Sequence, residues 1–277
     1  MMPVAKALWL IENRSASDLT LDEIAGLCGV SRFYMSRAFA LATGQPVMRY
    51  LRGRRLTEAA HALAAGAPDI LAVALEAGYG SHEAFTRAFR DHFGMTPEAV
   101  RSRRHLDDLA IVEAIRMDPK LLVDLEPPRF ENGRAFLVAG PAARYAFATN
   151  QGIPAQWQRF AQHIGHIPGQ VGDTTYGVSC NHDDAGYFDY ITGVEVSGFA
   201  ELPDDFARVR IPAQRYAVFS HRGHIAAIRG TIYTIWNKWL PESGHQVADA
   251  PNFERYGRDF DPKTGTGVVE IWVPIKA

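Results

Sequence analysis

Apolar residues in the first part of the chain recur every three to four positions, whereas in the second part they alternate or run together. In residues 1–105 this spacing, as in Leu21, Ile24 and Leu27, predicts amphipathic helices. After Pro128, short runs rich in β-branched and aromatic residues predict strands, with two amphipathic helices between them. The predicted strands are Arg134–Val138, Tyr176–Cys180, Tyr187–Val196, Arg215–His221 and Val268–Ile275, and the predicted helices are 154–166 and 224–240.

Polar caps and glycines mark where the predicted helices begin and end. Thr20 and Glu23 have the spacing of a capping box, in which each side chain accepts a hydrogen bond from a free backbone N–H group. Ser31 and Ser81 are placed as N-caps of two further helices. Glycines stand where helices should stop, at positions 29, 44, 78 and 94.

The first 105 residues contain an internal repeat with an offset of 50 positions. Each copy is a short helix, a glycine-containing turn and a serine-capped helix, which is the layout of a helix-turn-helix unit. The identities that align the copies are Ser31 with Ser81, Arg37 with Arg87, Ala38 with Ala88, Phe39 with Phe89, and Gly44 with Gly94. One long helix, from Gln45 to about Ala65, is predicted to connect the two units.

The second part of the chain contains a repeat of its own. The order strand, helix, two strands occurs twice, and Glu195 and Glu270 occupy equivalent positions in the third strand of each copy. We therefore expect an all-α double helix-turn-helix domain followed by an α+β domain made of two βαββ repeats, with a groove between the two helices. Residues 106–127 keep a helical pattern until prolines interrupt it, so the predicted domains are 1–107, a helical linker 108–127, and 128–277.

Composition and charge limit the classes of function. The 277 residues carry a net charge of −2, yet residues 1–107 hold 13 Lys and Arg against 11 Asp and Glu, and residues 108–277 hold 16 against 20. Cys28 and Cys180 form neither a disulfide framework nor a metal knuckle. Apolar runs are too short to span a membrane, and no secretory signal is evident, so we expect a cytoplasmic protein. The sequence also predicts no metal and no cofactor, because it has no metal-ligand spacing, phosphate loop or nucleophile elbow.

The segment Ile70–Arg101 resembles the signature of the AraC/XylS family of bacterial transcription regulators. The residues that carry this resemblance are Ala77-Gly78-Tyr79, Ser81, Phe85, Arg87, Phe89, Gly94, Thr96-Pro97 and Arg101. The resemblance implies two recognition helices that meet successive major grooves of a promoter site in double-stranded DNA. It assigns DNA contacts to Arg32, Phe33, Arg37, His82, Glu83 and Arg87.

These side chains suit base recognition, although two of them have a second interpretation. Arginine pairs with guanine, glutamate accepts from cytosine, and phenylalanine contacts the thymine methyl group. Phe33 could instead pack in the core, and Glu83 could repel phosphate. The resemblance also leaves RNA polymerase as a further partner.

The segments FDYITGVEVSG, RYAVFSHRG, FERYGRDFDP and VVEIWVPI resemble the GyrI-like effector-binding domain. The resemblance implies a small-molecule effector, in particular a hydrophobic cation, held by aromatic walls and a buried glutamate. Glu270 is the candidate carboxylate, because it interrupts an apolar run and shares a strand face with Trp272. The other candidate wall residues are Trp157, Tyr176, Tyr190, Tyr233, Trp236 and Tyr256.

Three alternatives stay open at this point. Glu270 could pair with Arg215 or Arg255 rather than with a ligand. Some GyrI-like proteins are thought to hydrolyse electrophilic compounds, which here would use Glu270 as a base with Tyr176 or Tyr256 nearby, although fusion to a DNA-binding domain favours sensing over catalysis. The second domain could also recruit a protein and bind no small molecule.

Overall fold

The computed structural model describes residues 2–14 and 19–276. By its internal contacts the chain divides into two compact units. The first comprises the chain up to Phe39 together with Gln45–Met117, and the second comprises Ala40–Gly44 and the chain from Asp118 onward. In the part of the chain that the structure describes, no helix is both long and apolar enough to cross a membrane.

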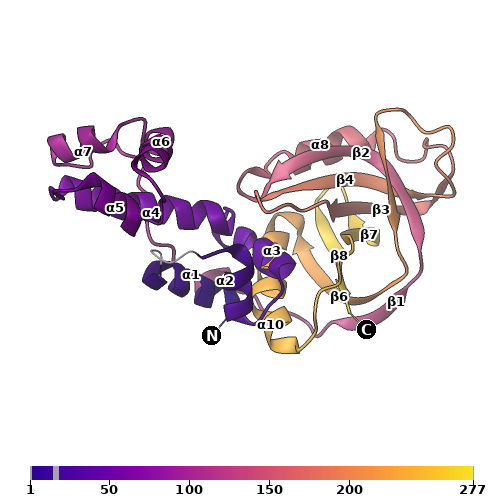
Figure 1. Ribbon diagram of the computed structural model, residues 1–277. Coiled ribbons are helices and arrows are strands. Elements are labelled where there is room, and N and C mark those ends of the chain that lie inside the picture. Colours follow the sequence, from indigo (N-terminus) through magenta and orange to yellow (C-terminus); the bar gives the residue numbers. More distant parts are fainter. Residues whose placement is uncertain (1, 15–18, 277) are drawn as a thin grey trace. The chain divides into compact units, whose positions relative to one another are not determined.

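The first unit is all helical, as the periodicity predicts (Figure 1). Its helices are α1 Pro3–Arg14, α2 Leu21–Cys28, α3 Arg32–Thr43, α4 Val47–Ala64, α5 Ile70–Glu76, α6 His82–Phe93 and α7 Pro97–Arg103. The capping box of Thr20 and Glu23 is formed, and Ser81 caps α6 through the backbone N–H of Ala84. Gly29 and Gly94 end α2 and α6 with φ values of 74° and 70°, which side chains with a Cβ rarely adopt.

Helix α4 is the connecting helix that the sequence predicts. Its 18 residues extend about 27 Å at 1.5 Å per residue. Its buried residues contact helices on both sides of it. Tyr50 packs against Phe39 of α3, and Leu56 and Leu63 lie in the core around Phe85 and Phe89 of α6. The two helix-turn-helix units of the repeat, α2–α3 and α5–α6, are therefore joined by one continuous rod.

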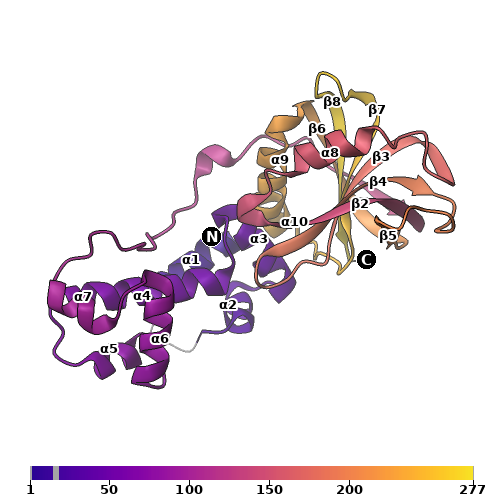
Figure 2. The same ribbon diagram turned by 90° about the horizontal axis from the view of Figure 1, so that it is seen from above.

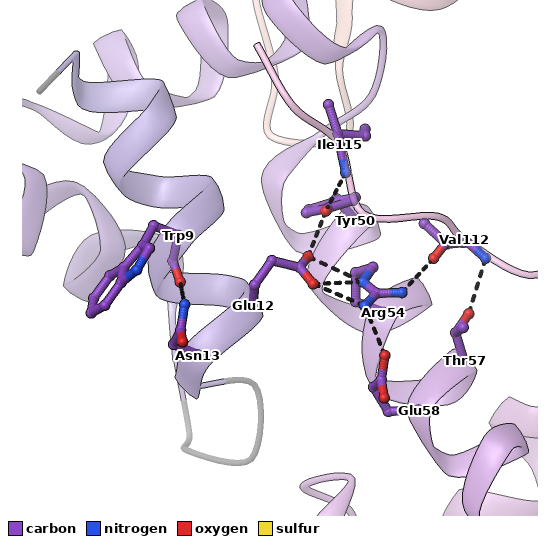
Figure 3. Close-up of polar contacts among 9 residues, drawn as sticks. All are labelled: Trp9, Glu12, Asn13, Tyr50, Arg54, Thr57, Glu58, Val112 and Ile115. Atoms are coloured by element: carbon purple, nitrogen blue, oxygen red, sulfur yellow. Dashed lines mark hydrogen bonds and ion pairs between the residues drawn. The ribbon is translucent and has the colours of Figure 1, made fainter.

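The predicted helical linker over residues 108–127 is wrong. The structure has no regular element between α7 and η1 (Pro119–Leu121), and the chain runs extended along α4. Figure 3 shows why: Tyr50 accepts a hydrogen bond from the backbone N–H of Ile115, and Arg54 donates to the carbonyl of Val112. Side chains of α4 thus satisfy backbone groups that a helix would have paired internally.

An apolar spacing of three gave the false helical signal in that segment. Leu109 is buried in the first unit's core, and Val112 packs so closely on Gly53 that a Cβ at that glycine would lie 2.7 Å from it. Leu109 and Val112 instead mark two places where a segment without regular structure contacts the helices of the first unit. Glu12 completes the attachment by accepting from both Tyr50 and Arg54 (Figure 3).

The second unit is a single eight-stranded antiparallel sheet with helices, which confirms the predicted α+β class (Figures 1 and 2). Its strands are β1 Arg129–Gly133, β2 Phe136–Ala146, β3 Gln170–Cys180, β4 Tyr187–Val196, β5 Phe206–Ile211, β6 Gln214–His224, β7 Asn252–Asp261 and β8 Thr266–Ile275. Its other helical segments are η2 Phe147–Thr149, α8 Ile153–Ala161, η3 Ile225–Ala227, α9 Ile228–Thr234, the π-helical η4 Ile235–Trp239 and α10 Leu240–Ser243.

Two βαββ repeats build this sheet, as the internal repeat predicts. The strand order is β1-β6-β8-β7-β3-β4-β2-β5, so β3 of the first repeat pairs with β7 of the second at the centre. The edge strands are exchanged: β1 precedes the first repeat but pairs with β6 of the second, and β5 precedes the second repeat but pairs with β2 of the first. The sequence did not predict β1, β5 or β7.

The sheet has a helix-covered face and a concave face. On the helix-covered face Phe160 of α8 packs against Ala139 and Val194, and Trp239 of η4 packs against Phe219 of β6. On the concave face, where the strands curl (Figure 1), Tyr176, Tyr216 and Phe253 belong to a separate core cluster. Side chains alternate between the faces along each strand, so neighbouring residues of β7 and β8 enter different environments.

Candidate functional site

The second helix-turn-helix unit presents its predicted DNA-binding residues on the outside of α6. Glu83 and Arg87 are exposed one turn apart, whereas Phe85 and Phe89 are fully buried on the opposite side of the helix. His82 is half-buried, with its Nε2 atom 3.3 Å from a carboxylate oxygen of Glu98. Backbone and Ser81 hydrogen bonds at the helix start lower the pKa of Glu83, so its carboxylate is ionised at neutral pH.

The first unit places its predicted residues less uniformly. Arg32 is exposed at the start of α3 and lies 2.6 Å from the carboxylate of Asp22. Phe33 is half-buried. Arg37 is only 5% exposed, unlike Arg87, its equivalent in the repeat. The sequence repeat treats the two arginines alike, but in the structure only Arg87 is on an exposed helix surface; a DNA contact by Arg37 stays a prediction.

The predicted ligand-binding residues separate onto the two faces of the sheet. Glu270, Trp272 and Tyr176 lie on the concave face. Trp157 and Tyr190 lie on the helix-covered face, where the indole Nε1 donates to the tyrosine hydroxyl at 3.2 Å. Tyr256 packs against Trp157 with ring centroids 4.7 Å apart. Tyr233 and Trp236 are buried in α9 and η4, where they are 5% and 1% exposed.

Glu270 forms ion pairs with Arg255 and Arg129. The alternative that Glu270 pairs with Arg255 is therefore confirmed. The Glu270 carboxylate accepts from Arg129 at 2.7 Å, from Arg255 at 3.0 Å and from the indole of Trp272 at 3.0 Å. Burial raises the pKa of Glu270, but these three hydrogen bonds outweigh burial and hold the pKa below its ordinary value. Any part of Glu270 in ligand binding stays a prediction.

The structure reveals a second strand carboxylate, Glu254, that the sequence analysis did not select. Tyr190 donates to its Oε2 atom at 2.5 Å, and Tyr256 donates to the same atom at 2.9 Å. Both tyrosines are buried, and their pKa values are raised by burial and by the charge of Glu254, so both remain protonated donors at neutral pH. The carboxylate is therefore held by two tyrosine hydroxyls, one of which in turn accepts from the indole of Trp157.

A glycine on β3 makes room for this arrangement. Gly177 is the register partner of Glu254, and a Cβ at Gly177 would lie 2.6 Å from Glu254 Oε2 and closer still to the hydroxyl of Tyr190. Any larger residue would push the two groups apart. Sequence alone offered one signal for the site: Glu254 and Tyr256 share the spacing of Glu270 and Trp272, with an aromatic residue two positions after a glutamate.

Two family profiles match the chain. The GyrI-like small molecule binding domain matches residues 126–276, and a helix-turn-helix domain matches residues 24–103. The transcriptional regulator Rob of Salmonella typhimurium is 25% identical over 97% of this chain and 96% of its own length. The transcriptional regulator BrlR of Pseudomonas aeruginosa is 28% identical over 70% of this chain and 77% of its own. The right origin-binding protein of Escherichia coli K12 is 24% identical over 97% of this chain and 96% of its own length.

Proposed function

This chain belongs to the GyrI-like family and is a DNA-binding transcription regulator with an AraC-type helix-turn-helix domain, and from that premise we propose that a small hydrophobic cation controls its DNA binding. The observation that carries the proposal is the Glu254 carboxylate on the helix-covered face, held by the hydroxyls of Tyr190 and Tyr256 and bordered by Trp157. A cation gains both charge pairing with a carboxylate and cation–π attraction to aromatic rings.

The same geometry favours binding over catalysis. Hydrolysis would use Glu270 as the base with Tyr176 or Tyr256 nearby. Burial raises the pKa of Glu270, but the hydrogen bonds from Arg255, Trp272 and Arg129 outweigh burial and hold the pKa below its ordinary value, which makes Glu270 a weaker base. Of the two tyrosines considered beside Glu270, Tyr256 bonds to Glu254 on the other face of the sheet. Tyr176 shares the concave face with Glu270, whose carboxylate is held there by Arg129 and Arg255. We therefore propose that the chain binds its ligand without turnover; unchanged recovery of bound compounds by chromatography would support this.

The test of the ligand site uses tetraphenylphosphonium and the full-length protein. Glu254→Gln should weaken binding at least about tenfold in calorimetry, because roughly 1.4 kcal/mol of charge interaction already changes the affinity tenfold. Glu126→Gln is the matched control, since that exposed carboxylate pairs with the exposed Arg222 in the same unit. Glu270→Gln discriminates the faces: if it abolishes binding while Glu254→Gln does not, the ligand site is on the concave face.

For DNA, the proposal assigns base contacts to the exposed face of α6, with His82, Glu83 and Arg87, and to Arg32, Phe33 and Arg37 of α3. Selection from random duplexes at fixed salt gives the preferred site. Arg87→Ala should then lower affinity for that site by about 1–3 kcal/mol and relax the selected base. Arg90→Ala removes the same charge from an exposed position of the same helix and should leave the selected sequence unchanged. An unchanged sequence for both variants contradicts base recognition by Arg87.

A further inference from the structure

The concave face of the sheet holds a pocket that the proposed cation site does not use. The pocket has a volume of about 290 Å³, close to the smallest pockets that bind organic ligands. It lies on the opposite side of β7 from Glu254, because Phe253 and Arg255 line it and alternate with Glu254 along the strand. A ligand in this pocket and a ligand beside Glu254 would therefore contact different side chains.

Aromatic rings form the apolar part of the pocket. Phe253 and Trp272 stack with ring planes 18° apart and centroids 5.3 Å apart. Tyr176 packs on Phe136 at 5.2 Å, and Tyr216 packs on Trp272 at 5.4 Å. Such a wall suits a flat aromatic ligand, since ring stacking adds to the free energy of apolar burial.

The charged part of the pocket is mostly cationic. Three arginines line it, Arg129, Arg134 and Arg255, against one carboxylate, Glu131. The two other carboxylates that pair with these arginines are more buried than the guanidinium groups: the side chain of Glu195 is 12% exposed against 66% for Arg134. Glu270 is 21% exposed against about twice that for Arg129 and Arg255. Glu131 is 43% exposed and pairs with Arg129 at 2.8 Å, so the accessible positive charge of the pocket that is not matched by an equally exposed carboxylate comes from Arg134 and Arg255.

The carboxylates also fix the orientation of these arginines. Arg134 donates to Glu195 at 2.7 Å while its guanidinium lies 5.4 Å from the ring centroid of Phe136. Arg129 is held by Glu270 and lies 5.8 Å from the ring centroid of Trp272. A guanidinium has five N–H donors, so these contacts leave donors for another acceptor. Binding loses less conformational entropy when the arginines are already ordered.

We propose that this concave pocket binds a small aromatic acid, with its ring on the Phe253–Trp272 stack and its carboxylate on Arg134 and Arg255. The two arginines suit the carboxylate because both line the pocket together with Tyr176 and are oriented there by Glu195 and Glu270. The fork of a guanidinium matches the two oxygens of a carboxylate. A ring system of one or two fused rings matches the small volume of the pocket.

The test compares three naphthalene probes that differ in charge: 2-naphthoate, 2-naphthamide and 2-naphthylmethylammonium. Calorimetry on the full-length protein at fixed ionic strength should give an affinity for the acid at least about tenfold above that for the amide, with the ammonium weakest at this pocket. Equal affinities of acid and amide, or no binding of the acid at millimolar concentration, would overturn the proposal.

Two variants locate the acid. Arg134→Gln and Arg255→Gln should each lower the affinity for 2-naphthoate about 5- to 20-fold and leave that for 2-naphthamide unchanged. Arg134→Lys, which keeps the charge without the fork, should lose less than Arg134→Gln. Arg144→Gln is the matched control, because Arg144 also bridges carboxylates, those of Asp183 and Asp189, but does not line the pocket. An equal loss for Arg144→Gln and Arg134→Gln would show general charge attraction and overturn the site.

The two proposals fail separately. Glu254→Gln should weaken the binding of tetraphenylphosphonium and leave the binding of 2-naphthoate unchanged. Arg134→Gln should weaken the binding of 2-naphthoate and leave the binding of tetraphenylphosphonium unchanged. Since Arg134 is mostly exposed, its glutamine variant should keep the native circular dichroism spectrum and unfolding midpoint. If Glu254→Gln weakens both probes equally, they share one site and the concave pocket is not a separate one.

Discussion

The two faces of the sheet carry the same short pattern, a glutamate followed two residues later by an aromatic residue, in opposite surroundings. On the helix-covered face, Glu254 accepts from tyrosine hydroxyls and has Tyr256 beside it. On the concave face, Glu270 accepts from two arginines and from Trp272. A strand pattern can therefore place a carboxylate and a ring together, but the partners from other strands decide whether the carboxylate can attract a cation or instead orients arginines for an anion.

Among substitutions that alter one face of the sheet, we expect Gly177→Ala on the helix-covered face to have the largest effect on stability. The added methyl group would overlap Glu254 and Tyr190, so we expect a loss of about 3 kcal/mol or more in the free energy of unfolding, the upper end for overpacking, and loss of tetraphenylphosphonium binding. Urea unfolding measures the first effect. Gly198→Ala, with open space around its Cβ position, should change the free energy by less than about 0.5 kcal/mol. Equal stabilities of the two variants would show that Gly177 does not position the helix-covered site.

An intermediate effect is expected for Glu270→Gln, with a defined pH dependence. Removing the charge between Arg129 and Arg255 should cost about 1–3 kcal/mol at neutral pH. Because the pKa of Glu270 is below 4.5 in the folded chain, its ionised form stabilises the fold above that pH, and the contribution is lost as the pH falls through the folded pKa. The difference between the native chain and the variant in thermal unfolding should therefore shrink below pH 4.5. A difference that is constant from pH 7 to pH 3.5 would contradict this.

The smallest effect on stability is expected for Arg134→Gln. This arginine is two-thirds exposed, and its ion pair with Glu195 faces solvent on one side, so the loss should be under about 1 kcal/mol and should decrease at high salt. Chemical unfolding at low and high ionic strength measures it. A loss as large as that of Glu270→Gln would mean that Arg134 belongs to the core of the concave face rather than to a surface available for ligands.

Local signals in the sequence predicted the local parts of the structure. The caps at Thr20 and Ser81 and the glycines at positions 29 and 94 are where the helices begin and end, because each acts on backbone groups within a few residues. Strand alternation likewise placed Glu270 and Trp272 on one face. The AraC/XylS and GyrI-like resemblances are both confirmed.

Contacts between distant segments could not be predicted in this way. The partner of Glu270, Arg129, is 141 residues away, and β1, on which Arg129 lies, has no alternating apolar pattern. Tyr190, one of the two tyrosines that donate to Glu254, is 64 residues away from it. The prediction of a helical linker was wrong for the same reason. Leu109 and Val112 are positioned by packing against α4 and not by helical hydrogen bonds within their own segment.

The exchanged edge strands determine how the second unit can be divided. Cutting the chain between the two repeats would leave β1 with the first half, although its hydrogen-bonding partner β6 is in the second, and β5 would be separated from β2 if it remained with β6. Each fragment would then expose an unpaired strand edge, and such edges invite pairing with other chains. We therefore expect the two halves, although each is a complete structural repeat, to unfold as a single cooperative unit, so that a ligand bound on either face would stabilise both halves together.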